Sequence, residues 1–456
     1  MSQNEKYRSI PKVDTVLKEP VLKDLPYDIT IIKRLLQQRI EYIRNEIAQG
    51  RINSSPEAGA IASEVAIHVK NILESGLKNV INAAGVIVFT NLGRAPLAQE
   101  ALDAVLHAGS TYSDLEFNLK DGKRGSRQSH IRPLTRACFG SEDALVVNNN
   151  AAAVMLVIAS LARGREVIVS RGELVEIGGS FRMPDVMSIS GAVLKEVGTT
   201  NKTRLSDYKN AVTDNTALIM KIHRSNFSIV GFTDETGIDE LSSLSRDIGK
   251  PLFVDMGSGV PFDLAPYGVS GEWTIPSCLQ QGADVISFSG DKVLGGPQAG
   301  IIIGREDLVE KMARHPLHRA VRVDKFTIAA LGVTLKLIAQ GRIDQIPVLR
   351  MITEPADHVK KRAQRLCRII NTKPCRIVGT QVVIGGGSAP TKSFQSFGVL
   401  LKAANASAIH SRLRACSPAV LCRIEEDRLI FDMKSVALNE IPVLARCINE
   451  VFSHGA

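Results

Sequence analysis

The residue most suited to covalent chemistry is a lysine that follows a short β-rich run. Lys292 lies in SFSGDKVLGGPQAGIIIG (287–304), directly after that run and before a pair of glycines. A lysine at the end of a buried strand is costly unless it is neutral or bonded. A Schiff base with pyridoxal phosphate would meet this need, and Ser289 could offer its hydroxyl to the cofactor phosphate. A surface lysine in a turn would give the same local pattern, so the interpretation depends on other residues.

A carboxylate stands at the end of another β-rich run. PLFVDMGSG (251–259) places Asp255 where a strand is expected to end. A carboxylate there could keep the pyridine nitrogen of the cofactor protonated, which makes the ring an electron sink. Aspartate also caps helices, and taken alone the two interpretations are equal. A strand-end aspartate followed by a strand-end lysine favours the cofactor.

Three asparagines separate a strand from a helix of small residues in VVNNNAAAVML (146–156). The free N–H groups at the start of a helix bind phosphate well. We therefore expect Asn149, Asn150 and Ala151 to hold the cofactor phosphate. A plain helix cap is the alternative, because asparagine is favoured at that position.

Three arginines form a further candidate set. Arg94 lies in TNLGRAPL (90–97), and Arg319 and Arg322 lie in HPLHRAVRVDK (315–325). Arginine suits bidentate recognition of phosphate oxygens. Three arginines exceed the need of one cofactor phosphate, so a second anionic substrate is plausible. Ordinary surface salt bridges are the alternative, which spacing alone does not exclude.

These residues need a scaffold, and the middle of the chain predicts one. Short apolar runs alternate with helical patterns, and the runs expected to be strands are 144–147, 166–170, 192–197, 217–223, 251–256, 284–289 and 299–304. Seven such runs predict a largely parallel sheet covered on both faces. Ligands of such sheets bind beyond the carboxyl ends of the strands.

The two ends of the chain differ from this middle part. Residues 1–64 are helical in pattern, with Ile31, Leu35, Ile40 and Ile43 at helix-like spacing. The basic residues interleaved with them are Lys33, Arg34, Arg39 and Arg44. They fit either a solvated helix face or a module that contacts RNA. A helical stretch after 335, followed by β-rich runs at 376–390 and 421–433, predicts a small α+β domain. We therefore expect domains at 1–64, 65–335 and 336–456.

Composition restricts the class of protein. The 456 residues are too many for one compact domain, and 44% hydrophobic and 23% charged residues are ordinary for a soluble protein. We find no stretch of about 18 apolar residues and no apolar core of a secretory signal near the start, so we expect a cytoplasmic protein without a membrane span. The net charge of +9 would favour an anionic partner such as nucleic acid.

The cysteines and histidines give no sign of a metal site. The seven cysteines are scattered and never spaced as CxxC, so we predict reduced, mostly buried thiols. The histidines are equally dispersed, without an HExxH pattern. Metal chemistry is therefore not expected.

Longer runs around the candidate residues resemble the bacterial selenocysteine synthase family. The matching runs lie at 81–97, 122–130, 147–154, 170–187, 196–208, 223–233, 288–301 and 315–325. They cover most of residues 80–335. IPKVDTVLK (10–18) resembles the amino-terminal segment of the family, and the last third is similar chiefly through GGGSAP (385–390).

The resemblance implies the α/β fold of fold type I pyridoxal-phosphate-dependent transferases, with a mostly parallel seven-stranded sheet. It also implies a small carboxyl-terminal α+β domain, a helical amino-terminal module that recognises tRNA, and a homodecamer. The implied reaction converts L-seryl-tRNA(Sec) to L-selenocysteinyl-tRNA(Sec) with selenophosphate, through a dehydroalanyl intermediate.

The resemblance also assigns roles to individual residues. Lys292 would hold the cofactor and act as general base, with Asp255 as its catalytic partner. The residues implied to bind selenophosphate are Arg94, Arg319 and Arg322. The side chain that stacks on the cofactor ring is not identified. We look for it in the 171–182 loop, where Arg171 and Glu173 are the candidates.

Two other functions remain open at this point. One is a pyridoxal-phosphate-dependent β-lyase or desulfurase that acts on a free amino acid. Against it, none of the cysteines lies in a glycine-rich loop, and the amino-terminal helices would have no role. The other is a tRNA-binding protein that no longer catalyses, which intact Lys292 and Asp255 argue against.

Overall fold

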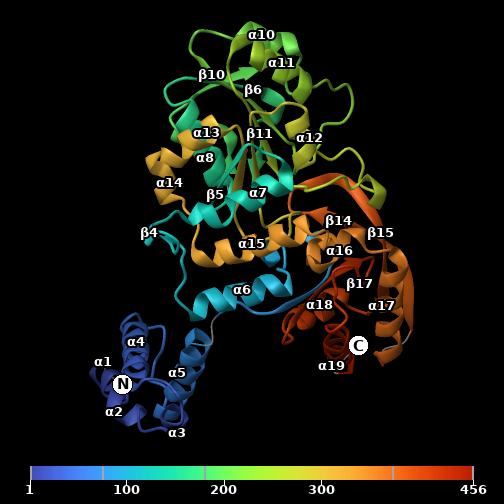
Figure 1. Ribbon diagram of the computed structural model, residues 1–456. Helices are drawn as coiled ribbons and strands as arrows, with labels where there is room; N and C mark the ends of the chain where they lie inside the picture. Colours follow the sequence, from blue (N-terminus) through green and yellow to red (C-terminus); the bar gives the residue numbers. More distant parts are fainter. Residues whose placement is uncertain (1–2, 74–75, 179–180, 372–373, 454–456) are drawn as a thin grey trace. The chain divides into compact units, whose positions relative to one another are not determined.

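The computed structural model describes residues 3–73, 76–178, 181–371 and 374–453. The chain divides into two compact units, Met1–Asn79 and Val80–Ala456. The helices of the first unit are α1 (Gln3–Arg8), α2 (Val13–Val16), α3 (Pro20–Lys23), α4 (Ile29–Ala48) and α5 (Ala58–Leu73) (Figure 1).

The first unit is helical, as its periodicity predicted. Asp28 begins α4, because its carboxylate accepts a hydrogen bond from the Thr30 N–H at 2.7 Å. The buried face of α4 consists of Ile32, Leu36, Ile40, Ile43 and Ile47, which pack with buried residues of α5. The domain boundary expected after residue 64 lies inside α5, because Val65 and Val69 complete this core.

The second unit contains the predicted seven-stranded sheet. Its strands are β5 (Asp143–Val147), β6 (Glu166–Ser170), β9 (Val193–Val197), β10 (Thr216–Ile222), β11 (Leu252–Gly257), β12 (Val285–Ser289) and β13 (Gly300–Gly304). Their order is β5-β13-β12-β11-β10-β6-β9. Only β13 runs antiparallel to its neighbours. Each of the seven predicted runs forms a strand, so this part of the prediction is confirmed.

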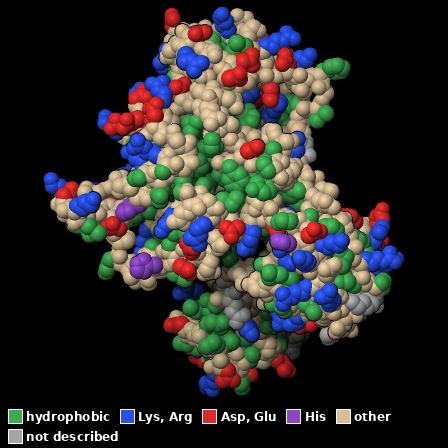
Figure 2. Space-filling view, turned by 45° about the vertical axis from the view of Figure 1, so that its right-hand side comes forward, with side chains coloured by type: hydrophobic (Ala, Val, Ile, Leu, Met, Phe, Trp, Pro, Cys, Tyr) green, Lys and Arg blue, Asp and Glu red, His purple; other side chains and the backbone are tan. Residues whose placement is uncertain are grey.

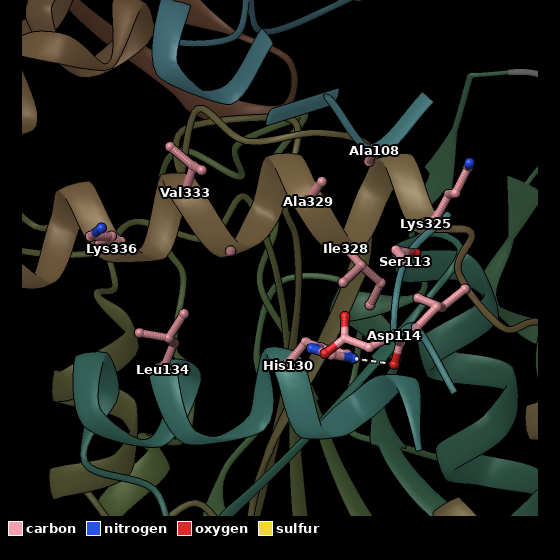
Figure 3. A pocket seen from close by; sticks show the side chains of 12 residues that line it. Ala108, Ser113, Asp114, His130, Leu134, Lys325, Ile328, Ala329, Val333 and Lys336 are labelled. Atoms are coloured by element: carbon pink, nitrogen blue, oxygen red, sulfur yellow. Dashed lines mark hydrogen bonds between the residues drawn. The ribbon is translucent and has the colours of Figure 1, made fainter. Parts of the chain in front are cut away.

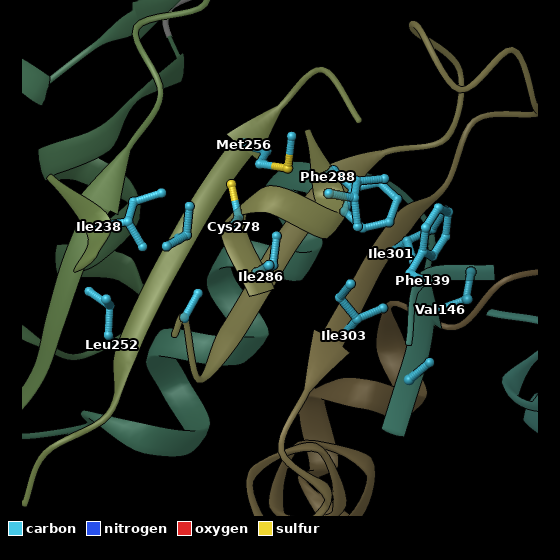
Figure 4. Close-up of a cluster of buried hydrophobic side chains, with 14 of the residues drawn as sticks. Phe139, Val146, Ile238, Leu252, Met256, Cys278, Ile286, Phe288, Ile301 and Ile303 are labelled. Carbon is cyan, nitrogen blue, oxygen red and sulfur yellow. The ribbon is translucent and has the colours of Figure 1, made fainter. Parts of the chain in front are cut away.

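Helices cover both faces of this sheet. Along β5 the side chains alternate: Ala144 and Val146 belong to one core cluster, and Leu145 and Val147 to the other. The first cluster includes side chains of α7 (Arg132–Phe139), α10 (Leu205–Ala211), α11 (Ile238–Ile248), α12 (Ile275–Gln280) and α15 (Lys325–Ala339) (Figure 4). The second includes side chains of α8 (Asn150–Leu161), α9 (Met183–Ile189) and α13 (Glu306–Arg314). Burial on both faces explains why the strands are apolar throughout.

A second, six-stranded sheet is formed by strands from both ends of this unit. Its order is β1 (Val80–Ala83), β16 (Ala419–Glu425), β17 (Arg428–Asp432), β15 (Ser388–Lys402), β14 (Cys375–Gly385) and β2 (Val86–Val88). Side chains of α17 (Ala356–Ile369), α18 (Ala406–Arg414) and α19 (Ile441–Ser453) pack with it. The predicted small α+β part therefore also takes in residues 80–88, which the sequence placed with the large domain.

The remaining elements of this unit lie outside the two large sheets and the helices that cover them. The α-helices among them are α6 (Gln99–Ser110), α14 (Pro316–Ala320) and α16 (Pro347–Thr353). The short 3-10 helices are η1 (Thr90–Leu92), η2 (Arg127–His130), η3 (Arg171–Glu173), η4 (Ala265–Tyr267) and η5 (Ile343–Gln345). Two small hairpins pair β3 (Phe117–Asn118) with β4 (Lys123–Arg124) and β7 (Glu176–Ile177) with β8 (Phe181–Arg182). None of the helices in the described ranges is long and apolar enough to cross a membrane.

The prediction that all cysteines are reduced is wrong for one pair. Cys367 of α17 and Cys375 at the start of β14 form a disulfide, with their Cα atoms 6.1 Å apart and so within disulfide reach. Burial raises the pKa of the Cys278 and Cys422 thiols to about 12. These two thiols are therefore protonated and unreactive at neutral pH.

Candidate functional site

Two neighbouring strands bring the predicted lysine and aspartate together. β11 and β12 pair in parallel with Asp255 opposite Ser287, and Lys292 follows the end of β12. Both charged side chains are buried, with 5% of Asp255 and 7% of Lys292 exposed. Each influences the pKa of the other by its charge. The structure therefore places a cation and an anion together at the carboxyl edge of the sheet, as the strand-end argument predicted.

Asp255 is held through one of its two oxygens. Its Oδ1 accepts hydrogen bonds from Asn150 Nδ2 at 2.8 Å, the Gly257 N–H at 3.2 Å and Ser287 Oγ at 3.3 Å. Gly257 has a φ of +69°, which lets the chain turn back so that its N–H reaches the carboxylate. No residue in the described ranges donates to Oδ2. The carboxylate is thus fixed in orientation and keeps one oxygen for an external donor.

Burial shifts both groups toward their neutral forms. It raises the pKa of Asp255, against the lowering effects of the Asn150 hydrogen bond and the Lys292 charge. It lowers the pKa of Lys292, with Asp255 opposing and Arg94 adding to the shift. A lysine with a lowered pKa is a better nucleophile and base near neutral pH. Such paired perturbations are typical of functional sites.

The asparagine triplet forms the start of α8 beside this pair. Asn149 caps the helix, because its Oδ1 accepts a hydrogen bond from the Ala152 N–H at 2.9 Å. Asn150 points to Asp255, and its own Oδ1 is buried without a hydrogen-bond partner. Gly300 allows the close approach of β13, since a Cβ there would lie 2.1 Å from the Asn149 carbonyl oxygen. Ser289 ends β12 and is buried.

Arg94 joins this group through Asp291. Its Nη1 donates to Asp291 Oδ2 at 2.8 Å, and Asp291 directly precedes Lys292. Arg94 has a φ of +69°, which is unusual for a residue with a side chain and holds it in the turn after η1. Asp291 Oδ1 is buried without a partner. The structure therefore brings one of the three predicted arginines to the lysine.

Of the other two arginines, Arg322 lies near the asparagine triplet. Residues 321–322 run beside the end of β5, where Asn148 N–H donates to the Val321 carbonyl at 2.8 Å. The Arg322 Nη1 lies 3.6 Å from Glu116 Oε1. Arg319 is exposed on α14, and its side chain has no hydrogen bond or ion pair to any described residue. No contact in the described chain links these two arginines to Arg94, so the predicted three-arginine site is not assembled by direct contacts.

Arg171 and Glu173, the candidates for stacking on the cofactor ring, form ion pairs with other residues. The Arg171 guanidinium binds Glu196 at 3.0 Å. The Glu173 carboxylate is buried and lies 2.6 Å from Lys221 Nζ. Neither side chain contacts Asp255 or Lys292, so the structure does not support these two guesses. Residues 179–180 of the same loop lie outside the described residues.

Sequence reasoning missed two residues that contact the site. Ser287 donates to Asp255, and Asp291 binds Arg94. Ser287 had a usable signal, because it stands two residues before Ser289 and so on the same side of the strand. For Asp291 the sequence shows only that it precedes Lys292, and this position does not indicate that Asp291 binds Arg94.

A separate cavity of about 350 Å³ lies between the end of α6, the η2–α7 segment and α15 (Figure 3). Its lining is largely apolar and includes Leu134, Ile328 and Val333, with His130 bonded to the Asp114 carbonyl at 3.3 Å. It shares no lining residue with the lysine group. It lacks the convergent polar groups of a catalytic site.

Comparison with known proteins agrees with this geometry. A family model described as L-seryl-tRNA selenium transferase matches residues 80–437. The L-seryl-tRNA(Sec) selenium transferase of Carboxydothermus hydrogenoformans is 44% identical over 459 residues, covering 99% of this chain and 98% of the relative. That of Aquifex aeolicus is 41% identical over 452 residues, covering 98% and 99%.

Among solved structures, D-glucosaminate-6-phosphate ammonia-lyase superposes with a TM-score of 0.60 at 19% identity, covering 85% of this chain and 98% of that one. This likeness concerns the fold alone, and it confirms the predicted fold type I architecture. The family match and the relatives show more than the fold. The chain belongs to the L-seryl-tRNA selenium transferase family.

Proposed function

We propose that the protein converts L-seryl-tRNA(Sec) to L-selenocysteinyl-tRNA(Sec) with selenophosphate and pyridoxal 5'-phosphate. The observation that carries the proposal is the buried pair of Lys292 and Asp255, in a chain of this family. Such a pair fits the cofactor, because one carboxylate oxygen is free for the pyridine nitrogen and burial lowers the pKa of the Lys292 amine.

The residues around the pair fit the rest of the cofactor. Lys292 would hold it covalently through its ε-amino group, and Asp255 would bind its ring nitrogen. The start of α8, with Asn149, Asn150 and Ala151, offers backbone N–H groups for the phosphate, together with Ser289. When bound, the cofactor supplies an electron sink for negative charge at the Cα of the seryl group.

The protein's own residues would manage the protons of the reaction. Lys292, with its amino group free, would be positioned to remove the Cα proton of the seryl group. Its lowered pKa would favour the unprotonated amine for this step. The serine hydroxyl would leave as water, selenophosphate would add to Cβ through selenium, and Lys292 would return the proton to Cα. Hydrolysis of the Se–P bond would then release phosphate and leave the selenol. Burial of the pair excludes water, which protects the dehydrated seryl group from side reactions.

The selenium donor is an anion, and basic residues are available for it. We assign its binding to Arg94, Arg319 and Arg322, as the family resemblance implies. Arg94 supports this assignment, since Asp291 holds it next to Lys292. Arg319 and Arg322 belong to the segment in which the Val321 carbonyl accepts a hydrogen bond from the Asn148 N–H.

We assign recognition of tRNA(Sec) to the amino-terminal helices. Lys33 and Arg34 on α4 are exposed and have no ion pair with a described residue. The net charge of +9 supports an anionic macromolecular partner, and such a partner places the protein in the cytoplasm.

We also propose a homo-oligomer, with the decamer of the resembled family as the expected form. Its support is the set of large apolar side chains that the second unit leaves exposed on and around α6 and α15, which are Leu102, Leu106, Tyr112, Phe117, Leu119 and Phe326. Exposed apolar groups on this scale mark protein interfaces. Light scattering coupled to gel filtration gives the assembly mass, and a monomer would contradict the proposal.

The decisive experiment is to incubate the cofactor-loaded protein with seryl-tRNA(Sec) and selenophosphate, and to identify the esterified amino acid by mass spectrometry. Selenocysteine is the expected product. Parallel reactions with free L-serine and L-cysteine test the β-lyase or desulfurase alternative. Turnover of a free amino acid without turnover of seryl-tRNA would overturn the proposal.

A further inference from the structure

One face of α17 is exposed and strongly basic. The helix packs its other face, with Val359, Ala363 and Leu366, into the core of the six-stranded sheet. The exposed cations are Lys360, Lys361, Arg365 and Arg368. At 3.6 residues per turn they lie on the same side of the helix, with Gln364 between them. Asp357, near the start, is the one acidic residue of α17.

These four charges are not neutralised by neighbouring acids. No acidic side chain in the described ranges forms an ion pair with any of them. Glu354, just before the helix, is engaged by Arg362 through hydrogen bonds of 2.6 and 2.7 Å. Lys360 contacts an aromatic ring instead, with its Nζ 5.3 Å from the centroid of Phe397. The four side chains therefore carry a charge of about +4, which the single carboxylate of α17, that of Asp357, offsets only in part.

Figure 2 brings the side of α17 forward, and Lys and Arg side chains gather there over the carboxyl-terminal elements. Some exposed arginines of this unit have acidic partners, as Arg182 has Glu176 and Arg314 has Glu310. The face of α17 differs from these sites, because four exposed cations lie together on one helix without such partners.

The dimensions of the face fit a nucleic-acid strand. From 360 to 368 the helix rises roughly 12 Å, at about 1.5 Å per residue. One strand of a duplex presents a phosphate about every 3.4 Å along the axis, so the face spans roughly three to four phosphates. Two of its cations are arginines, which can bind phosphate oxygens in pairs. The exposed side has one large apolar residue, Ile369 at its end, which is too little for insertion into a membrane.

We propose that the face of α17 formed by Lys360, Lys361, Arg365 and Arg368 is a second docking surface for tRNA, separate from the amino-terminal helices. It binds the sugar-phosphate backbone without base specificity. Its lysine and arginine side chains contact phosphate oxygens, and the face has no element that enters a groove to contact base edges. The inference rests on the proposed function, since that function supplies the tRNA.

The test uses the full-length, cofactor-loaded protein and unmodified tRNA(Sec) transcript. A quadruple variant replaces Lys360, Lys361, Arg365 and Arg368 by glutamine, and binding is measured over a series of salt concentrations. We expect tRNA affinity to fall at least about tenfold, and the slope of log K against log salt to become shallower by about 3 to 4. With seryl-tRNA as substrate, KM should rise and kcat should stay unchanged.

A matched control removes four exposed cations elsewhere in the same unit that likewise have no ion pair with a described residue, through Arg163→Gln, Lys209→Gln, Arg246→Gln and Lys311→Gln. It makes the same change in net charge and should leave the affinity within about twofold of wild type. The double variant Arg365→Lys with Arg368→Lys keeps the charge and should retain most of the binding.

Two results would overturn the inference. One is a quadruple α17 variant that binds tRNA with the affinity and salt slope of wild type. The other is an equal loss in the matched control, which would mean that net charge alone matters. Failure of the proposed function is distinguishable, because wild type itself would then neither bind tRNA(Sec) nor turn over seryl-tRNA.

Discussion

Replacement of Asn150 by alanine tests how Asp255 is held in its charged form. Burial raises the pKa of Asp255, and the hydrogen bond from Asn150 is the largest of the effects that oppose this shift. A hydrogen bond to a charged group contributes about 1.5–3 kcal/mol, and one pKa unit corresponds to about 1.36 kcal/mol. Loss of this bond should therefore raise the pKa of Asp255 further.

The sign of the effect on activity follows from the role of the carboxylate. In the proposed role, Asp255 must be ionised to keep the cofactor nitrogen protonated, so we expect activity to be lost as pH falls through its pKa. A higher pKa moves this acid limb to higher pH, by roughly one to two pH units in Asn150→Ala. Ser287→Ala should shift it less, because the Ser287 bond of 3.3 Å is longer than the Asn150 bond of 2.8 Å.

The assay is the pH dependence of kcat/KM for seryl-tRNA, followed on the acid side. Asn405→Ala is the matched control. Asn405 caps α18 through a 2.9 Å hydrogen bond to the Ala408 N–H, so its loss lowers stability without touching Asp255. An acid limb in Asn150→Ala that coincides with that of wild type would refute the assignment of Asn150 as the group that holds Asp255 ionised.

The remaining predictions concern the lysine, the amino-terminal unit, an arginine and the core. Lys292→Ala should lose the absorption band expected near about 420 nm for the cofactor-loaded protein, together with turnover, and a persistent band would show that another residue holds the cofactor. Removal of residues 1–79 should strongly weaken the salt-sensitive binding of seryl-tRNA and leave only the contribution of the α17 face, while the band remains because Val80–Ala456 is a compact unit of its own; unchanged affinity would give those helices another role. Arg94→Ala should raise KM for selenophosphate more than KM for seryl-tRNA, and an equal rise in both would count against a site for the anion. Phe288→Ala should lower the free energy of unfolding by about 3–5 kcal/mol in denaturant titrations, because Phe288 is fully buried and packs edge-on against Phe139 with ring centroids 5.7 Å apart (Figure 4).

The large sheet could be predicted because its strands are buried on both faces. Runs such as ALVV (144–147) and AGIIIG (299–304) are apolar throughout, which is a strong signal in a single sequence. The strand-end argument then placed Lys292 and Asp255 at one edge, and the structure agrees. Asn150 was assigned to the phosphate, and the structure adds its bond to Asp255.

Long-range pairing was harder to predict. Residues 80–88 form β1 and β2, but their pairing with β16 and β14 leaves no local pattern in the sequence. The first part of β15, SAPTKSFQ, is too polar to indicate a strand. The Cys367–Cys375 disulfide depends on how closely the end of α17 and the start of β14 approach each other, which spacing alone does not reveal. Side-chain partners such as Asp291 for Arg94 need the fold itself.

The way the six-stranded sheet is assembled has a consequence for biosynthesis. Val80 pairs with Ala419, so β1 emerges from the ribosome about 340 residues before its partner. At about 5–20 residues per second, β1 waits roughly 20–70 s with its backbone groups unpaired. An unpaired strand edge of this kind can pair with other chains, so β1 is open to misassociation throughout that time. Completion of this sheet therefore comes late in synthesis, after every strand of the seven-stranded sheet has emerged.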